Sequence, residues 1–142
     1  MDPVTAIGLL ASVSQLIQGC NTLLTLIKSF KDGDKDLLEI VNHVSSFEEA
    51  LKGFDRVLRS RQTQHHIAPE VIKAALEEGF ATIQNLQRRL AQIFKVDLSA
   101  VRRMKWVQNK SSLTKLQERL KAQNTMLQSF LALAHALVAL PF

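Results

Sequence analysis

Residues 3–27 read PVTAIGLLASVSQLIQGCNTLLTLI, a run of 25 residues without a charged side chain. Apolar residues recur in it at alternating steps of four and three, which is the period of one face of an α-helix. This stripe consists of Leu9, Val13, Leu16, Cys20, Leu23 and Ile27, and it continues to Phe30. Asp2 stands where an N-cap is expected, and Pro3 suits the first helical turn. The stretch therefore predicts a long helix from about Pro3 to Phe30.

Three further segments show the same periodicity, from about Lys35 to Arg59, Pro69 to Phe94 and Leu113 to Leu140. Their stripes are Leu37, Ile40, Val44, Phe47, Leu51, Phe54 and Leu58; Ile72, Leu76, Phe80, Ile83, Leu86, Leu90 and Ile93; and Leu113, Leu116, Leu120, Leu127, Phe130, Ala134 and Leu137. A short helix carrying Trp106 is expected between Ser99 and Asn109, before a cap at Ser111 or Ser112. No segment alternates like a strand. The sequence predicts an all-α fold, an antiparallel up-down four-helix bundle with a short extra helix between the third and fourth long helices.

The length and composition indicate one domain, residues 1–142. With 142 residues and a hydrophobic fraction of 46%, the chain is long enough and apolar enough to bury a core. Its lone cysteine, Cys20, lies on an apolar stripe and is expected to be a buried small hydrophobe. The first charge is acidic, unlike a secretory signal, so a cytoplasmic location is expected. The chain stops shortly after its last predicted helix, so we expect it to be the N-terminal part of a longer protein.

The sequence contains no motif that would carry catalysis or hold a cofactor. Phosphate-binding loops, nucleophile elbows and zinc-binding HExxH patterns are all missing from it. Asp32, Asp34 and Asp36 read as turn and cap residues without calcium-loop spacing, and His65-His66 reads as part of a polar link. The sequence therefore predicts a protein that is not an enzyme and needs no cofactor or metal.

The first helix allows two interpretations. A second apolar row, Leu10, Ile17 and Leu24, flanks its main stripe, so more than one face is hydrophobic. Such a helix is either the buried centre of a bundle or a segment that meets lipid, and its uncharged run is long enough to span a bilayer. The fourth helix, uncharged from Ala122 to Phe142, is expected to pack beside the first.

The charge of the chain is concentrated in one segment. Residues 95–121 carry a net charge of +6, whereas the whole chain carries +5. Cations beside Trp106 suit anionic lipid headgroups, and the predicted contacts are Arg102, Arg103, Lys105 and Lys110. A solvated bundle end and a nucleic-acid surface are the alternatives. No helix-turn-helix, zinc-finger or RNA-binding signature accompanies the charge, so no nucleic-acid partner is expected.

Two segments resemble a known family. The opening MDPVTAIGLLASVSQLIQGCNTLLTLIKSF, residues 1–30, is similar to the start of fungal HeLo-like domains, the N-terminal domains of fungal STAND receptors, which are NLR-like proteins. The later segment RRMKWVQNKSSLTKLQERLKAQNTMLQSFLALA, residues 102–134, is similar to the long helix that closes such domains. The resemblance rests on patterns over nearly the whole chain. It implies a helical bundle related to the executioner domain of mixed-lineage kinase-like pseudokinases.

The resemblance also implies a function, that of a cell-death effector domain of a fungal NLR-like immune or heterokaryon-incompatibility protein. Other domains of the parent receptor would bring copies together, and the N-terminal helix of each homo-oligomer subunit would permeabilise the plasma membrane. Carried onto this chain, the membrane-inserting role falls on Ile7, Leu9, Leu10, Val13, Leu16 and Ile17. Several relatives carry an acidic residue inside this helix, but nothing acidic lies between Asp2 and Asp32. This departure predicts different pore chemistry, or the alternative function of an adaptor that recruits partners without entering a membrane.

Overall fold

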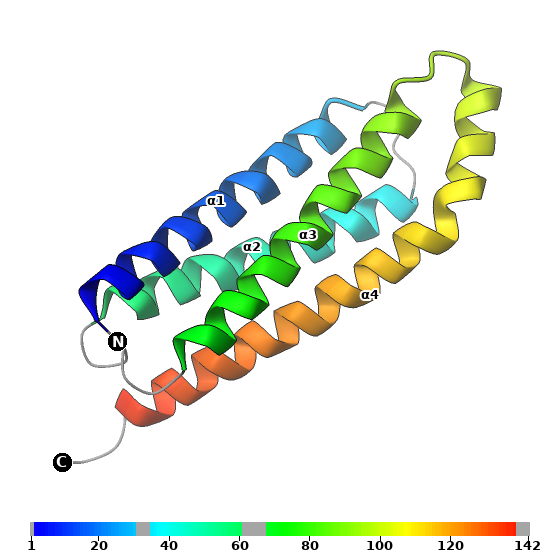
Figure 1. Ribbon diagram of the computed structural model, residues 1–142. Coiled ribbons are helices and arrows are strands. Elements are labelled where there is room, and N and C mark those ends of the chain that lie inside the picture. Colours follow the sequence, from blue (N-terminus) through cyan, green and yellow to red (C-terminus); the bar gives the residue numbers. More distant parts are fainter. Residues whose placement is uncertain (1, 31–34, 61–67, 139–142) are drawn as a thin grey trace.

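The computed structural model describes residues 2–30, 35–60 and 68–138, and these residues form four α-helices (Figure 1). The helices are α1 Pro3–Lys28, α2 Lys35–Arg59, α3 Pro69–Phe94 and α4 Ser99–Val138. The predicted all-α four-helix bundle is confirmed. The bounds of α2 and α3 agree with those expected from the spacing of their apolar residues.

The N-terminus of α1 is capped as its sequence predicts. The Asp2 side chain accepts a hydrogen bond of 2.7 Å from the Thr5 backbone N–H, and Pro3 occupies the first turn. This hydrogen bond holds the pKa of the Asp2 carboxyl below its ordinary value, because it stabilises the charged form. At the other end, the Ser29 N–H donates to the Thr25 carbonyl and closes the last turn.

The fourth helix is longer than predicted. Residues Ser99–Val138 form one helix of 40 residues, so the separate short helix predicted before it is wrong. The residues of that short helix are the first turns of α4. The stretch contains neither Pro nor Gly, which would interrupt a helix, and Ser111 and Ser112 lie inside it rather than at a cap. Figure 1 shows that α4 bends in its yellow part while remaining helical.

The order of the helices around the bundle differs from the expected one. The helices α1 and α4 each pack against both α2 and α3, and within the described ranges no backbone contact joins α1 to α4 or α2 to α3. These two pairs are therefore diagonal, and the expectation that the fourth helix packs beside the first is wrong. An apolar stripe specifies which face of a helix turns inward, but it does not specify which helix becomes the neighbour.

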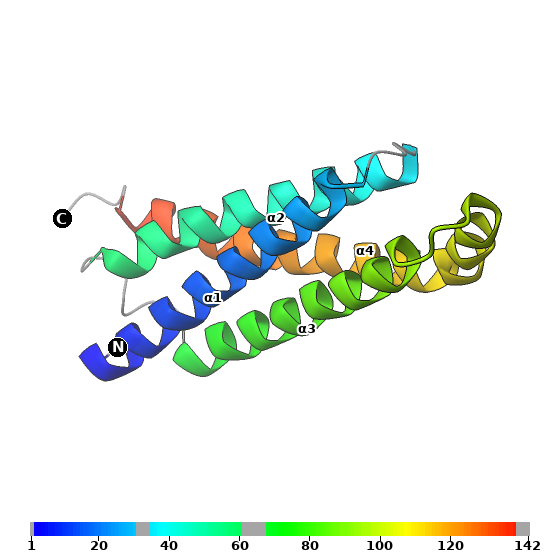
Figure 2. The same cartoon turned by 90° about the horizontal axis from the view of Figure 1, so that it is seen from above.

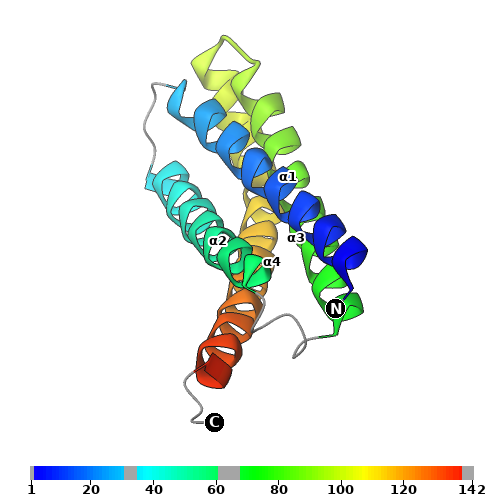
Figure 3. The same ribbon diagram turned by 90° about the vertical axis from the view of Figure 1, so that its left-hand side faces the viewer.

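The chain reverses direction at each link. Figure 1 shows α1 and α3 advancing away from the end that carries the N-terminus, and α2 and α4 returning toward it. The packed pairs α1 with α3 and α2 with α4 therefore run parallel, as the other two views also show (Figure 2, Figure 3). The sequence-adjacent pairs α1–α2 and α3–α4 run antiparallel. The first turns of α4 and the last turn of α1 consequently share one end of the bundle.

The core has a close contact at its centre, between Gly79 of α3 and Phe47 of the diagonal helix α2. A Cβ atom on Gly79 would lie 2.9 Å from Cζ of Phe47 and 3.2 Å from Cδ2 of Leu16. Only glycine leaves room for both side chains here. Phe80, which was predicted to lie in the buried stripe, is instead 37% exposed. The inward position belongs to Gly79, and the ring of Phe47 fills the space that this glycine leaves.

Candidate membrane-contact site

Five of the six residues predicted to insert into membrane face the interior of the bundle. Leu9, Val13 and Leu16 are buried in the core. Leu10 and Ile17 are half-buried against it, and Leu24, the third member of their row, is buried. The sixth residue, Ile7, is 67% exposed. In the folded bundle the apolar rows of α1 are therefore mostly covered by α2 and α3, so this second row does not separate the membrane interpretation from the adaptor interpretation.

The helix α1 is held by apolar packing alone. Its described side-chain hydrogen bonds are all local, and none of its described side chains forms a hydrogen bond or ion pair with another helix. The other helices are joined by polar side-chain pairs. These pairs are Asp36–Trp106 and His43–Gln117 between α2 and α4, and Thr82–Gln123 and Arg89–Asn109 between α3 and α4. Withdrawal of α1 would break none of these hydrogen bonds.

The solvent-facing side of α1 is polar but uncharged. Ser12, Gln15, Gln18 and Thr22 are exposed on it. Among the residues that the structure describes, α1 is the one helix long and apolar enough to cross a bilayer, and 28% of its most apolar 18-residue window is buried. Core helices of soluble proteins and signal sequences meet the same condition. The composition of α1 therefore permits membrane insertion without requiring it.

The structure divides the four predicted lipid-contacting cations into two pairs. Arg103 and Lys110 are exposed, whereas Arg102 and Lys105 are half-buried. The Arg102 guanidinium lies 5.0 Å from the centre of the Phe30 ring, and its Nη2 donates to the Asp97 carbonyl at 3.5 Å. Arg102 thus fastens the start of α4 to the chain that follows α1. Only Arg103 and Lys110 are fully available to a partner.

Trp106 also faces inward rather than toward a partner. It is half-buried, and its Nε1–H donates to Oδ2 of Asp36 at 3.2 Å. At the same end of the bundle, the Phe30 and Phe94 rings stack with their centres 4.1 Å apart. These contacts hold the residues that follow α1, the last turn of α3 and the first turns of α2 and α4 together at one end of the bundle.

Two exposed apolar residues were missed by the sequence interpretation. Met104 is 57% exposed and Val107 is 67% exposed, and in sequence both fall between Arg103 and Lys110. They lie three residues apart, hence on one face of α4, which is the face opposite the buried stripe. The sequence would have predicted their exposure if residues 99–109 had been assigned to the same helix as Leu113, because their spacing from Leu113 places them on its far side.

Cys20 is buried, as expected, and its thiol has low reactivity. Burial first, and then the negative charge of Glu48, together raise its pKa to about 12. Glu48 is itself buried on α2; its Oε1 pairs with Lys52 at 3.1 Å. A neutral, enclosed thiol is a poor nucleophile and a poor metal ligand. No cluster of three possible metal ligands occurs within residues 2–30, 35–60 and 68–138.

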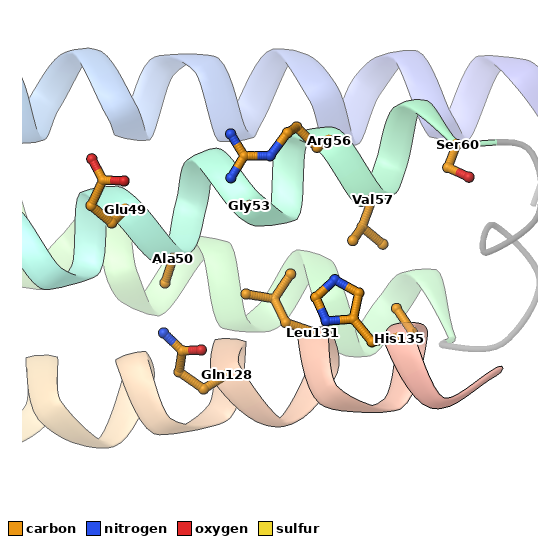
Figure 4. Close-up of a pocket in the computed structure, with 10 residues that line it drawn as sticks. Glu49, Ala50, Gly53, Arg56, Val57, Ser60, Gln128, Leu131 and His135 are labelled. Carbon is orange, nitrogen blue, oxygen red and sulfur yellow. The ribbon is translucent and has the colours of Figure 1, made fainter. Parts of the chain in front are cut away.

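A groove of about 490 Å³ lies between α2 and α4, at the end of the bundle opposite Trp106. Figure 4 shows Leu131 and His135 of α4 extending toward Ala50 and Val57 of α2. A Cβ atom on Gly53 would lie 3.3 Å from Cδ1 of Leu131, so this glycine sets how closely the two helices approach there. Apolar and small residues, Ala50, Gly53, Val57, Leu131 and Ala134, form one half of the lining, and the polar residues Glu49, Arg56, Ser60, Gln128 and His135 form the other half.

Comparisons with protein-family profiles, with curated proteins and with solved structures find no match to this chain.

Proposed function

We propose that this chain is a membrane-permeabilising effector domain whose α1 leaves the bundle and enters the lipid when copies are brought together. The observation that carries the proposal is the attachment of α1 by apolar packing alone, while α2, α3 and α4 are joined by polar side-chain pairs. The resemblance to fungal HeLo-like domains supports the same function, that of a cell-death effector of an NLR-like immune or incompatibility protein. The domain would rest in the cytoplasm and act at the plasma membrane.

The energetics favour a switch that needs lipid. Eight residues of α1 are buried in the bundle. Burial of each large aliphatic side chain is worth about 1.5–3 kcal/mol, so exposing this stripe to water would cost on the order of 10 kcal/mol. In water α1 therefore stays in place. Hydrocarbon compensates for the lost burial. Among the described side chains α1 forms no polar bond to another helix, so its departure leaves no such partner unsatisfied.

Insertion of α1 requires clustering of several copies in addition to lipid. A single marginally apolar helix binds lipid weakly, and several helices that enter together gain from a high local concentration. In the proposed mechanism other domains of the parent receptor would provide the clustering, and the active form would be a homo-oligomer. The exposed, uncharged polar face of α1 would then turn toward its neighbours and toward water, and its apolar stripe toward lipid.

A reversible lock on α1 tests the proposal. A Cβ atom on Gly19 would lie 3.5 Å from Cγ2 of Ile83 on α3, which is close enough for a designed disulfide. We would combine Gly19→Cys and Ile83→Cys with Cys20→Ala, fuse the chain to an oligomeriser, and measure dye leakage from anionic liposomes. The reduced protein should cause leakage and the oxidised protein should not. The Gly19→Cys/Cys20→Ala protein should leak equally in both states, and circular dichroism should show each form folded.

Two outcomes would contradict the proposal, and they differ. Equal leakage from the oxidised and reduced proteins would mean that α1 remains in the bundle while the membrane is breached. No leakage from any clustered form, including the wild type, would remove the permeabilising function itself.

The adaptor function is a second candidate, and the groove between α2 and α4 is the observation in its favour. Its lining combines apolar residues such as Leu131 with polar ones such as Glu49 and Arg56, which suits an amphipathic helix of another helical domain. An adaptor would assemble with its partner equally well when α1 is locked by the disulfide. A permeabilising domain would not function in that state, so the same variant separates the two functions.

A further inference from the structure

The outer face of the first turns of α4 combines exposed cations with exposed apolar side chains. Arg103 and Lys110 are exposed seven residues apart, and Met104 and Val107 are 57% and 67% exposed between them. We name these four residues the cationic tip. Spacings of three, four and seven residues place the four on one face of α4, on which Met104 is farthest from the buried Leu113 and Lys110 is nearest to it. The cationic tip therefore faces solvent, and no other described helix covers it.

The charge around the cationic tip is strongly one-sided. Residues 95–110 contain five cationic residues and one acidic residue, a net charge of +4 out of the chain's total of +5. The single acid, Asp97, lies in the link before α4. The described ion pairs of the molecule lie on α2, away from this segment. Asp36 of α2 lies against Trp106 at the same end, but on α4 and the link before it the cations outnumber the acids. The field over the outer face of these turns is therefore positive and attracts an anionic surface.

We propose that the cationic tip docks the folded bundle onto a membrane containing anionic lipid. Arg103 and Lys110 would pair with headgroup phosphates or carboxylates, and Met104 and Val107 would enter the boundary between headgroups and acyl chains. Nucleic acid fits less well, because a phosphate backbone offers no apolar layer for the two side chains that lie between the cations. The inference deepens the proposed function, on which it rests for its biological purpose, by naming the surface that holds the domain before α1 moves.

Docking through the cationic tip would also orient the domain. The tip shares one end of the bundle with the last turn of α1, whereas the N-terminus lies at the opposite end (Figure 1). Phe30, which follows α1, contacts Arg102 in the same turns of α4. The docked bundle would therefore stand on the end where α1 joins the rest of the chain. The N-terminal turns of α1 would point away from the lipid and would have to swing toward it.

Vesicle binding by the unclustered chain tests the docking surface separately from leakage. We would measure co-sedimentation of residues 1–142 with phosphatidylcholine vesicles, with and without phosphatidylserine, at about 0.1 M salt, where charges act over about 10 Å. Binding should require phosphatidylserine. Each Lys or Arg near such a surface contributes about fivefold, so Arg103→Gln/Lys110→Gln should weaken binding roughly 25-fold.

The same helix offers matched controls. Arg119→Gln/Lys121→Gln removes the same charge from exposed positions further along α4. Met104→Ser removes an apolar side chain from the tip, and Met126→Ser is its control because it makes the same change at an exposed methionine outside the tip. Both controls should weaken binding several-fold less than the tip variants. The disulfide-locked chain should bind vesicles normally although it cannot leak, so that failure of docking and failure of α1 release give different results.

Three outcomes would overturn the inference. The first is an absence of binding to phosphatidylserine vesicles. The second is equal loss of binding in the tip variants and their matched controls, which would indicate a diffuse charge effect. The third is salt-sensitive binding to duplex DNA that the tip variants abolish, together with weaker binding to vesicles, which would assign the surface to nucleic acid.

Discussion

The indole N–H of Trp106 donates a hydrogen bond of 3.2 Å to the Asp36 carboxylate, joining residues 70 positions apart in the sequence. Asp36 lies in the first turn of α2 and Trp106 in the early turns of α4. The contact ties these two helices at the end of the bundle that carries the cationic tip. It therefore supports the part of α4 on which the proposed docking surface depends.

This hydrogen bond should contribute measurably to folding stability. In a double-mutant cycle with Trp106→Phe and Asp36→Asn, we expect a coupling free energy of about 1 kcal/mol. This is less than the roughly 1.5–3 kcal/mol of a typical hydrogen bond to a charged group, because the pair is only half-buried. Urea unfolding followed by circular dichroism measures it. Strictly additive single-variant effects would show that the two side chains do not interact in solution.

Two glycines should respond oppositely to alanine. Gly79→Ala places a methyl group 2.9 Å from Phe47 in the core, so we expect a loss of about 1–2 kcal/mol of unfolding free energy after the gain in helix propensity. Gly8 is exposed on α1 with nothing within 4 Å of its Cβ position. Gly8→Ala should therefore stabilise the chain by about 0.5–1 kcal/mol. Thermal or urea unfolding of the two variants checks the contrast, and the same sign of change in both would contradict the packing described.

Cys20 should be inert in the folded chain. Its pKa is raised from an ordinary value of 9.0 to about 12, first by burial and then by the charge of Glu48. At pH 8 a thiol reagent should label it only as fast as the protein opens, and should label it rapidly in urea. Rapid labelling of the native protein would show that α1 already separates from the bundle in water.

The same thiol makes stability depend on pH in a defined direction. Below pH 9 both states keep the thiol proton, so it contributes no pH dependence. Between pH 9 and about pH 12 only the unfolded state loses the proton, so the free energy of unfolding falls as pH rises, with a limiting slope of about 1.4 kcal/mol per pH unit from this group. Cys20→Ala should remove that component. An unchanged slope in this variant would assign the effect to other groups.

If α1 lines a pore, its uncharged polar face should make the pore weakly selective for ion charge. Gln15 is exposed on that face, and residues 3–27 contain no Asp, Glu, Lys, Arg or His. In planar bilayers under a salt gradient, the wild-type reversal potential should lie close to zero. Gln15→Glu should shift it toward cation selectivity and Gln15→Lys toward anion selectivity.

A glutamate outside α1 provides the control for this shift. Gln92 is exposed on α3, and Gln92→Glu should leave the reversal potential unchanged. Strong selectivity in the wild type, or equal shifts from Gln15→Glu and Gln92→Glu, would show that the α1 face does not line the conducting path.

The amino-acid sequence by itself determined α1, α2 and α3 and most of their inward positions, whereas it misplaced the start of α4. The stripes from Leu9 to Ile27 and from Leu37 to Leu58 are buried as predicted, because an apolar residue every three or four positions leaves a helix only one face that can form a core. The all-α fold class was predicted from the same helical periodicity of apolar residues. Caps such as Asp2 were also readable, because they act over three residues.

Only the tertiary structure decided which helices are neighbours and which side chains remain free. Arg102 and Arg103 are adjacent and chemically identical, yet one lies over the Phe30 ring and the other faces solvent. The diagonal position of α4 relative to α1, and the lack of polar bonds from α1 to the other helices among the described side chains, also depend on contacts between distant residues. Helical periodicity describes a residue relative to its own axis. It carries no information about which other helix occupies the space that the residue faces, and that relationship determines which helix can be released and which surface can bind.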